Sequence, residues 1–326
     1  MFLWLTYQAM RQAGLDCAAI FASVGMPDEP PDRRQRRINS PQQRFWGAAE
    51  QDSGDSDIGL HIGERMGPFR GQVLEYLCLS SDTFGEGLRR MLRYNRLVTD
   101  AMQFELRVEG NTAMLIGLEH PVRHYLECAT AVILRFLRLV TDGDFQPSAI
   151  HYTYPQGACA QEYQRVFRCP VTLGASEGAI CFDAGLLARP SLAAEPELLA
   201  VHEKVAAQKL AALGRRDFLH ILERELGGLL EQGNATVEAL AERVGRSPRA
   251  LRAELASAGT SFREVVAGYR ERLARRLLAS TREPIDQIIY LTGFSEPAAF
   301  TRAFKRWSGE TPTAYRKRKQ AADEDF

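Results

Sequence analysis

Basic side chains at helical spacing mark the C-terminal part of this sequence. Arg249 and Arg252 lie three residues apart, so an α-helix would place both on one face. A guanidinium can bond O6 and N7 of guanine through two hydrogen bonds, or clamp a phosphate. Further along, Arg302 could reach a base or a phosphate, and Lys305 a phosphate. These residue types at this spacing favour binding to nucleic acid.

These basic residues belong to two copies of one sequence pattern. The first copy is Val237-x-x-Leu240-Ala241-x-x-Val244-Gly245, followed by Ser247, Leu251, Leu255 and Gly259. The second is Ile285-x-x-Ile288-Ile289-x-x-Thr292-Gly293, followed by Ser295, Phe300, Phe304 and Gly309. Each copy predicts a short apolar helix ended by glycine, a tight turn, a serine N-cap and a second helix with an apolar i, i+4 pair. A helix–turn–helix of this kind presents its second helix to the major groove of DNA.

The second helix of each copy is expected to turn its apolar residues inward. Leu251 and Leu255 face the core in the first copy, and Phe300, Phe304 and Trp307 do so in the second. For any one basic residue taken alone, a solvated side chain is the alternative, but repetition on two helices favours DNA contact. The candidate DNA contacts are Ser247, Arg249, Arg252, Glu296, Pro297, Ala298, Thr301, Arg302 and Lys305.

The same region predicts an all-α domain over residues 215–320 with two helix–turn–helix motifs. Thr236 is expected to cap the first motif helix, and an apolar stripe at helical spacing predicts one long helix that joins the motifs as a rigid rod. A connector over 196–214 is expected to be helical and to break at Gly214, and residues 321–326 form an acidic tail. The predicted helices are Glu197–Leu213, Asp217–Glu231, Val237–Val244, Pro248–Ala258, Ser261–Ser280, Pro284–Leu291, Glu296–Trp307 and a short one from Thr311-Pro312 to the basic run Arg316–Lys319.

Charge is divided unevenly along the chain, although the formal net charge is zero. Residues 241–320 contain 17 Lys+Arg against 8 Asp+Glu, a net of +9, so the remainder carries −9. A basic module attached to an acidic body predicts a polyanionic partner for that module alone, the alternative being a well-solvated surface.

The N-terminal body, residues 1–195, is predicted to have an α+β fold. Residues 2–66 carry helical periodicity in Leu3–Ala13 and Pro41–Gln51, with a polar break at Pro27–Pro31 and Arg33–Arg37. The arginine cluster is interpreted as a solvated loop, with nucleic-acid binding as the alternative. Two β-α-β-β units joined by a helix would give an antiparallel sheet layered with helices. Their elements are predicted as strand Gly71–Ser80, helix Phe84–Thr99, hairpin strands Gln103–Val108 and Ala113–Leu118, helix Leu126–Thr141, strand Ala149–Tyr154, helix Ala160–Phe167, and strands Val171–Leu173 and Ala179–Phe182.

Charged and aromatic residues near the predicted element ends of the body are candidates for binding a small polar effector. A pocket for such a ligand is mostly apolar with a few fixed polar groups, and Arg123 would suit a carboxylate bound bidentately. For each residue singly, a surface polar or core aromatic role is the alternative. The candidates are Tyr94, Arg123, His124, Glu127, His151, Tyr152 and Tyr154.

Several function classes find no support in the sequence. We find no GxSxG, HExxH, P-loop or GxGxxG in a strand–helix context, so an enzyme is not expected. His120 and His124 are four apart, but Pro121 lies between them, and the six cysteines show no CxxC spacing, so no metal or cofactor is expected. No run approaches the roughly twenty apolar residues that span a bilayer, and Met1–Met10 lacks a basic leader region. The chain is therefore expected to be cytoplasmic, with reduced thiols and no membrane contact.

The segment from about Asp217 to Arg318 resembles the DNA-binding domain of the AraC/XylS family of bacterial transcription regulators. The second motif carries the family's most specific stretch, Thr292-Gly293-Phe294-Ser295-Glu296-Pro297-Ala298-Ala299-Phe300-Thr301-Arg302-Ala303-Phe304-Lys305-Arg306-Trp307, then Gly309-Glu310-Thr311-Pro312-x-x-Tyr315-Arg316. The first motif departs from the family, which often has an aromatic and further basic residues where this chain has Ala253-Glu254-Leu255. Arg249 and Arg252 are therefore expected to read the bases there.

The body resembles the effector-binding region of one AraC-family branch whose members respond to amino acids or small metabolites. The residues that carry this likeness are Leu79-Ser80-Ser81-Asp82-Thr83-Phe84-Gly85-Glu86-Gly87-Leu88 with Arg93-Tyr94, and Phe167-x-x-Pro170-Val171. It does not resemble the cupin barrel of the arabinose sensor. The resemblance implies a promoter-binding activator that forms a homodimer, contacts RNA polymerase and responds to an effector. A body that only dimerises or binds a protein partner is the alternative.

Overall fold

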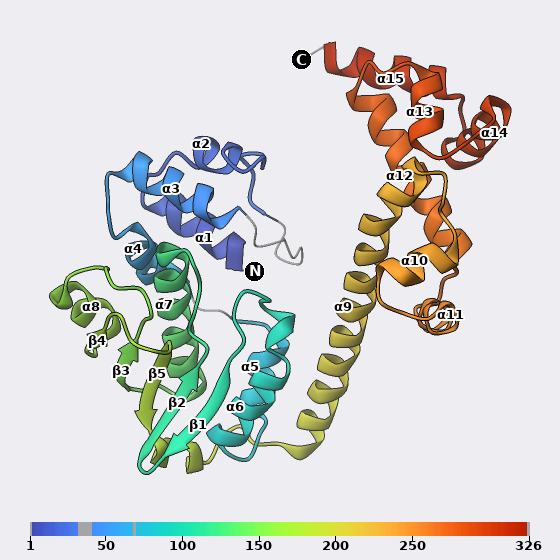
Figure 1. The fold of residues 1–326 in the computed structure, drawn as a ribbon. Helices are drawn as coiled ribbons and strands as arrows, with labels where there is room; N and C mark the ends of the chain where they lie inside the picture. The colour runs from blue at the N-terminus through green and yellow to red at the C-terminus, as the bar shows by residue number, and fades with distance from the viewer. Residues whose placement is uncertain (1, 32–40, 68–69, 325–326) are drawn as a thin grey trace. The chain divides into compact units, whose positions relative to one another are not determined.

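In the computed structural model, which describes residues 2–31, 41–67 and 70–324, the chain divides into two units (Figure 1). The first unit is Met1–Leu210 and the second is Ala211–Phe326. Within the described residues no helix is both long and apolar enough to cross a membrane.

The N-terminal unit begins with helices, as the periodicity of residues 2–66 predicts. The Asp16 side chain caps the second helix by accepting from the Ala19 amide, and Gly54, at φ 65°, ends the third. The predicted loop at Arg33–Arg37 lies outside the described residues. These helices are α1 (Phe2–Gln12), α2 (Cys17–Ala22), α3 (Gln42–Ser53) and α4 (Ile58–Arg65).

The predicted strand at Gly71–Ser80 is wrong, because this segment forms helix α5 (Val73–Leu79). Its apolar residues Val73, Leu74 and Leu77 are all buried, and their i, i+1, i+4 spacing fits a helix as well as an apolar strand. The hydroxyl of Ser80 donates to the Tyr76 carbonyl and completes the last turn. Helix α6 (Phe84–Arg93) and the short 3-10 helix η1 (Asn95–Leu97) follow in place of the longer helix expected up to Thr99.

Five strands form one sheet in the order β1-β2-β5-β3-β4. The predicted hairpin is confirmed, with Gly110 at φ 58° in its turn. All pairings are antiparallel except β3–β4, so the α+β class is confirmed but a purely antiparallel sheet is not. The proposed repeat holds only in its second unit, since the first lacks its leading strand. The strands are β1 (Glu105–Glu109), β2 (Thr112–Ile116), β3 (Pro147–His151), β4 (Val171–Thr172) and β5 (Ala179–Asp183).

Helix α7 (Arg123–Val140) is the central buried helix of the unit. It packs closely against α4 because that helix presents glycine at the contact. A Cβ on Gly59 would lie 2.3 Å from the His124 Cα, and one on Gly63 2.9 Å from the Cys128 Cα. Both glycines lie one turn apart on α4, so they fix how deeply the first turns of α7 sit beside it. Helix α8 (Ala160–Phe167) also packs on α7, and the 3-10 helix η2 (Ala184–Ala188) packs on α6.

Helix α9 (Pro196–Glu231) is continuous, so the predicted break at Gly214 is wrong. A glycine inside a helix costs only about 1 kcal/mol relative to alanine, and good helix formers flank this one. The division between the two units falls inside α9, at Leu210–Ala211. The predicted domain boundaries at 195 and 214 remain predictions.

The C-terminal unit contains both predicted helix–turn–helix motifs. Thr236, Ser247 and Ser261 each cap a helix with their side chain, whereas the expected cap at Ser295 is wrong, since Glu296 occupies that position without a side-chain bond. The last helix continues to Glu324 through part of the predicted acidic tail. The helices are α10 (Val237–Arg243), α11 (Pro248–Ser257), α12 (Phe262–Ser280), α13 (Ile285–Leu291), α14 (Pro297–Ser308) and α15 (Pro312–Glu324).

Each motif has its own small core on the shared helix α12. Leu251 and Leu255 of α11 pack with Val265 and Val266 from the first half of α12. Phe300 and Phe304 of α14 pack with the second half of α12, chiefly Ala274 and Leu278. The apolar stripe of α12 therefore supports both motifs, as the sequence predicts.

Candidate nucleic-acid interface and effector site

The second helix of the first motif, α11, has one buried and one open face. Leu251 and Leu255 are fully buried, while Arg249 and Arg252 are exposed. Ser247 starts the helix by accepting a hydrogen bond from the Ala250 amide at 3.2 Å. Ser247 is therefore both the N-cap of α11 and a predicted DNA contact.

The two exposed arginines differ in their surroundings. Arg252 pairs with Glu238 of α10 at 2.9 Å, but both side chains are more than half exposed. Such a surface pair contributes about 0–1 kcal/mol, so a phosphate or base could replace the carboxylate at little cost. Arg249 forms no ion pair with any described residue.

The second helix of the second motif, α14, repeats this arrangement. Phe300 and Phe304 are fully buried, and Trp307 packs partly against the same core. Arg302 and Lys305 have no ion-pair partner among the residues that the structure describes. The predicted contact positions are all exposed, namely Glu296, Pro297, Ala298, Thr301, Arg302 and Lys305.

The turns that join the helices of each motif are equivalent. Gly245 and Gly293 both adopt left-handed backbone, at φ 65° and 73°, as the glycine pattern predicts. After each turn the chain enters α11 or α14 through a proline at the first helical turn.

Part of the basic excess is structural, because several partly buried arginines bind backbone carbonyls. Arg270 of α12 donates to the Gly293 carbonyl at 2.8 Å and lies over the Phe294 ring, and burial lowers its pKa. Arg275 donates to the Trp307 carbonyl at 2.6 Å, and Arg316 to the Glu283 carbonyl. These arginines hold the second motif together. The sequence analysis missed this role, because the net charge of a segment does not show which of its basic side chains point inward.

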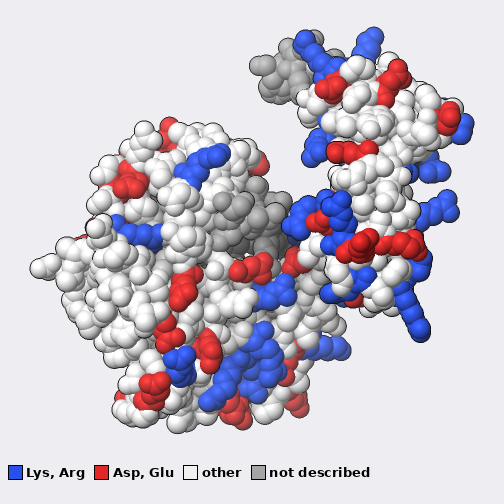
Figure 2. All heavy atoms as spheres, in the orientation of Figure 1, with Lys and Arg blue, Asp and Glu red and all other residues white. Residues whose placement is uncertain are grey.

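Figure 2 shows Lys and Arg side chains projecting from the C-terminal unit, with acidic side chains interspersed among them. The exposed basic residues of this unit include Arg249 and Arg252 of α11 and Arg302 and Lys305 of α14.

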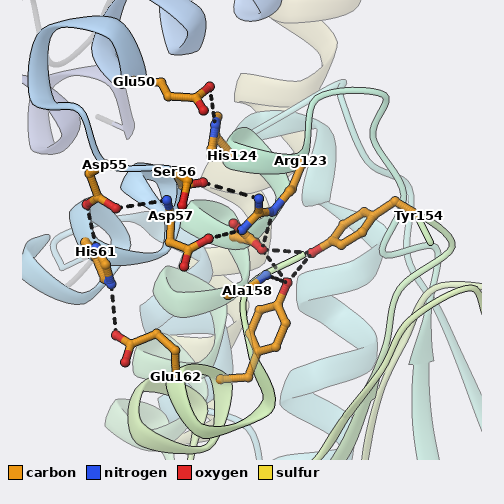
Figure 3. Close-up of polar contacts among 12 residues, drawn as sticks. Glu50, Asp55, Ser56, Asp57, His61, Arg123, His124, Tyr154, Ala158 and Glu162 are labelled. Carbon is orange, nitrogen blue, oxygen red and sulfur yellow. Dashed lines mark hydrogen bonds and ion pairs between the residues drawn. The ribbon is translucent and has the colours of Figure 1, made fainter. Parts of the chain in front are cut away.

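In the N-terminal unit, several predicted effector residues meet around the carboxylate of Glu127. This side chain is fully buried. Its Oε1 accepts from Arg123 Nε at 2.9 Å, from the Tyr154 hydroxyl at 3.2 Å and from the Tyr163 hydroxyl (Figure 3). Its Oε2 has no hydrogen-bond partner among the described residues.

Arg123 is already engaged with protein groups. Besides Glu127, it contacts the carboxylate of Asp57 and donates to the Ser56 carbonyl at 3.2 Å. Burial on its own lowers the pKa of Arg123, but the charge of Glu127 and the hydrogen bonds outweigh it and raise the pKa. The guanidinium therefore stays charged and pairs with two carboxylates, whose combined charge exceeds its own.

The tyrosines around Glu127 form an aromatic wall. Tyr152 and Tyr154 stack with ring centroids 4.7 Å apart, and the Tyr152 hydroxyl donates to Thr130 at 2.8 Å. Burial raises the pKa of Tyr154 and Tyr163, so both hydroxyls keep their protons and can donate to Glu127. Tyr163 was missed by the sequence analysis, although its i, i+4 spacing with Phe167 marks the buried face of α8.

The remaining predicted effector residues are not all part of this cluster. His124 lies beside it, with Nε2 3.2 Å from Glu50 and Nδ1 without a described partner. Tyr94 packs instead in a separate apolar cluster with Leu77 and Ala206. His151 lies on β3 in register with Ala179 and Thr172, and no polar contact joins it to Glu127.

A second ion-pair network borders the cluster and was not predicted. His61 of α4 contacts Asp55 at 2.5 Å and Glu162 of α8 at 2.8 Å. Burial on its own lowers the pKa of His61, but the hydrogen bonds that the imidazole donates to both carboxylates outweigh it and raise the pKa. The hydrogen bond from Arg165 chiefly lowers the pKa of Glu162, to about 2, so this carboxylate is charged and links α4 to α8.

Each of the two units matches a known protein family model. A family model described as the N-terminal arabinose-binding domain of AraC transcription regulators matches residues 14–191, and a helix-turn-helix domain model matches residues 240–318.

Curated relatives match over nearly their whole length. The chain is 27% identical over 315 residues to the ornithine utilization regulator of Pseudomonas aeruginosa, covering 95% of this chain and 91% of the relative. It is 28% identical over 330 residues to the transcriptional regulator VirS of Mycobacterium tuberculosis, covering 96% and 94%. The solved structure of the regulator CdpR from Pseudomonas aeruginosa aligns at a TM-score of 0.40 and 22% identity, over 87% of this chain and 94% of that one. With a helix-rich body, a five-stranded sheet and two helix–turn–helix motifs, this chain belongs to the AraC family of transcription regulators.

Proposed function

We propose that this AraC-type regulator recognises promoter DNA with α11 and α14 together and responds to a small effector bound in its N-terminal unit. The observation that carries the first part is the repetition of one motif on one rigid helix, with an open basic face on each presented helix. Helix α12 has 19 residues, hence a length of about 28 Å at 1.5 Å per residue. Because α11 packs on the first half of this helix and α14 on the second, the two presented helices are held apart along one rod, as contact with successive major-groove segments requires.

Base and phosphate contacts divide between the exposed residues by their chemistry. Arg249 and Arg252 suit base edges, because a guanidinium can bond guanine bidentately. Lys305 suits a phosphate, Arg302 either kind of contact, and Ala298 at most a thymine methyl. Ser247, Glu296, Pro297 and Thr301 complete the proposed DNA surface.

The effector site is proposed around Glu127, where Arg123, Tyr154 and Tyr163 converge from α7, the β3–α8 loop and α8. A buried polar cluster with an unpaired oxygen is costly unless something binds there. Effector binding would shift the body between two arrangements, and α9 is the covalent link to the DNA-binding unit. One relative is named for ornithine utilization, which is consistent with a small metabolite as the signal.

The remaining parts of the proposal follow the family. We infer a cytoplasmic homodimer that activates transcription through RNA polymerase. The alternative hypothesis is a regulator whose N-terminal unit only dimerises or binds a protein partner. The buried, incompletely satisfied Glu127 favours sensing, since a purely dimerising body has no need of it.

The DNA-binding part is tested by selecting binding sites from random-sequence DNA with the full chain, then titrating salt on the selected site. We expect one enriched sequence with an affinity that falls steeply as salt rises, because bound phosphates release counterions. Enrichment of no sequence, or binding that ignores salt, would contradict the proposal.

The sensing part is tested by a thermal-shift screen of metabolites on the full chain. The full chain is needed because a fragment ending near residue 213 would cut through α9. A stabilising metabolite that also changes promoter output supports sensing. A folded protein that regulates its promoter but is stabilised by no metabolite class supports the dimerising alternative.

A further inference from the structure

The hydrogen-bond geometry of Glu127 indicates which class of ligand the proposed effector site would bind. The carboxylate is fully buried, and all three of its protein donors, from Arg123, Tyr154 and Tyr163, contact the same oxygen, Oε1. Oε2 accepts nothing from the described residues. A buried carboxylate oxygen without a donor is unfavourable, so the site is complete only when a donor occupies it.

Arg123 is poorly placed to receive the carboxylate of a ligand. Each of its three nitrogens already contacts a protein oxygen, on Glu127, Ser56 and Asp57. An incoming anion would therefore lie against two carboxylates. The sequence suggests that Arg123 binds a ligand carboxylate. These contacts fit better with Arg123 holding Glu127 in place.

The charge of the surrounding network also favours a cation. Among the described residues, ion pairs connect or border the site through six carboxylates but only two arginines, so acidic groups outnumber arginines in these pairs. The carboxylates are Glu50, Asp55, Asp57, Glu64, Glu127 and Glu162.

Aromatic rings add a second feature that suits a cation. Tyr154 and Tyr163 turn their hydroxyls to the carboxylate, and Tyr152 stacks on Tyr154, so the rings form an aromatic border next to which an ammonium or guanidinium group can lie favourably. The loop between β3 and α8 lies directly over them. A Cβ on Gly157 would lie 2.2 Å from the Tyr163 hydroxyl, so this loop packs closely against the tyrosines.

We propose that Glu127 binds the ammonium or guanidinium group of a small cationic effector through its Oε2, and that Arg123 is a positioning residue that fixes the carboxylate. This inference rests on the proposed sensing function and names the ligand class for that site. An anionic metabolite would face the negative network, and a neutral donor would pair with Oε2 without compensating its charge.

The class is tested on the full wild-type chain with probes matched in shape and different in charge. The pairs are n-butylguanidinium with n-butylurea, n-butylammonium with n-butanol, and n-butylammonium with butyrate, so that only one member of each pair carries a cationic group. We expect the cationic member of at least one pair to raise the Tm and to bind in calorimetry about tenfold or more tightly than its partner, as a charge-assisted bond implies.

The location is tested by amide hydrogen exchange and by two variants. A cationic probe should slow exchange in peptides covering 120–128 and 153–163. Glu127→Gln keeps the shape of the side chain and should weaken binding by about tenfold or more, whereas Glu177→Gln, which removes a carboxylate paired with Arg107 away from the site, should not. If Glu127→Gln fails to fold, the exchange pattern of the wild-type chain decides the location.

The outcomes separate this inference from the sensing function on which it rests. Stabilisation only by anionic or neutral metabolites would overturn the cationic class while leaving sensing intact. Protection by a cationic probe confined to other peptides would overturn the assignment to Glu127. Stabilisation by no metabolite of any class would overturn both.

Discussion

The turn glycines of the two motifs occupy equivalent positions but have different surroundings. Gly245 and Gly293 share a left-handed backbone, at φ 65° and 73°. A Cβ on Gly245 would meet nothing within 4 Å among the described residues. A Cβ on Gly293 would lie 2.7 Å from Leu230 Cδ2 and 3.2 Å from Arg270 Nη2. Replacing each glycine by alanine therefore separates backbone strain from steric conflict.

The expected magnitudes follow from these contacts. A left-handed alanine costs about 1–2 kcal/mol, partly offset by about 0.4–1 kcal/mol from the less flexible unfolded chain. Gly245→Ala should thus cost about 1 kcal/mol. Gly293→Ala adds an overpacking cost of about 1–3 kcal/mol, because Leu230 is buried and Arg270 is fixed by its bond to the Gly293 carbonyl, which gives about 2–4 kcal/mol in total.

Native-state hydrogen exchange of the full chain measures both values. The free energy of opening should be read from peptides in α10 for Gly245→Ala and in α13 for Gly293→Ala, each against the wild-type chain. DNA affinity at the selected site should fall further for Gly293→Ala. Equal losses of local stability in the two variants would refute the argument that Leu230 and Arg270 crowd the second turn.

Four other variants test further predictions, the last of them through a pH titration. Arg249→Ala and Arg252→Ala should each cost about 1–3 kcal/mol of binding free energy on the selected site and make binding less sequence-specific. Lys305→Ala should lower the affinity for specific and random DNA equally and make the affinity depend less steeply on salt. Equal losses of affinity on both DNAs for all three variants would contradict the proposal that the arginines read bases. Since the folded pKa of His61 is raised, its stabilising contribution should be complete below about pH 6.5 and be lost as pH rises through the folded value. Urea unfolding of wild type and His61→Gln across this range checks it, and identical pH profiles would contradict it.

The C-terminal unit was predictable because its signals are local. Glycine at a left-handed turn, a serine N-cap and an apolar i, i+4 pair each act within a few residues, and Gly245, Ser247 and Leu251 show all three. The exception, Ser295, precedes a helix that begins one residue later than expected, at Pro297.

The N-terminal unit was less predictable because its decisive contacts are distant in sequence. The segment around Leu74 has an apolar run that fits either period, and only packing selects the helix. Glu127 meets Tyr163 across 36 residues and His61 meets Glu162 across 101, which no local pattern reports. The same limit explains why Tyr94 was grouped with Arg123 although the fold separates them.

The central claim is that one chain reads two successive major-groove segments through α11 and α14. Hydroxyl-radical footprinting combined with guanine-methylation interference on the selected site tests it most directly. We predict two protected blocks per chain, asymmetric in sequence, with centres about one helical turn, roughly 34 Å, apart. Arg249→Ala should alter only one block and Arg302→Ala only the other. Protection of one short block per chain, or loss of the same block in both variants, would contradict the claim.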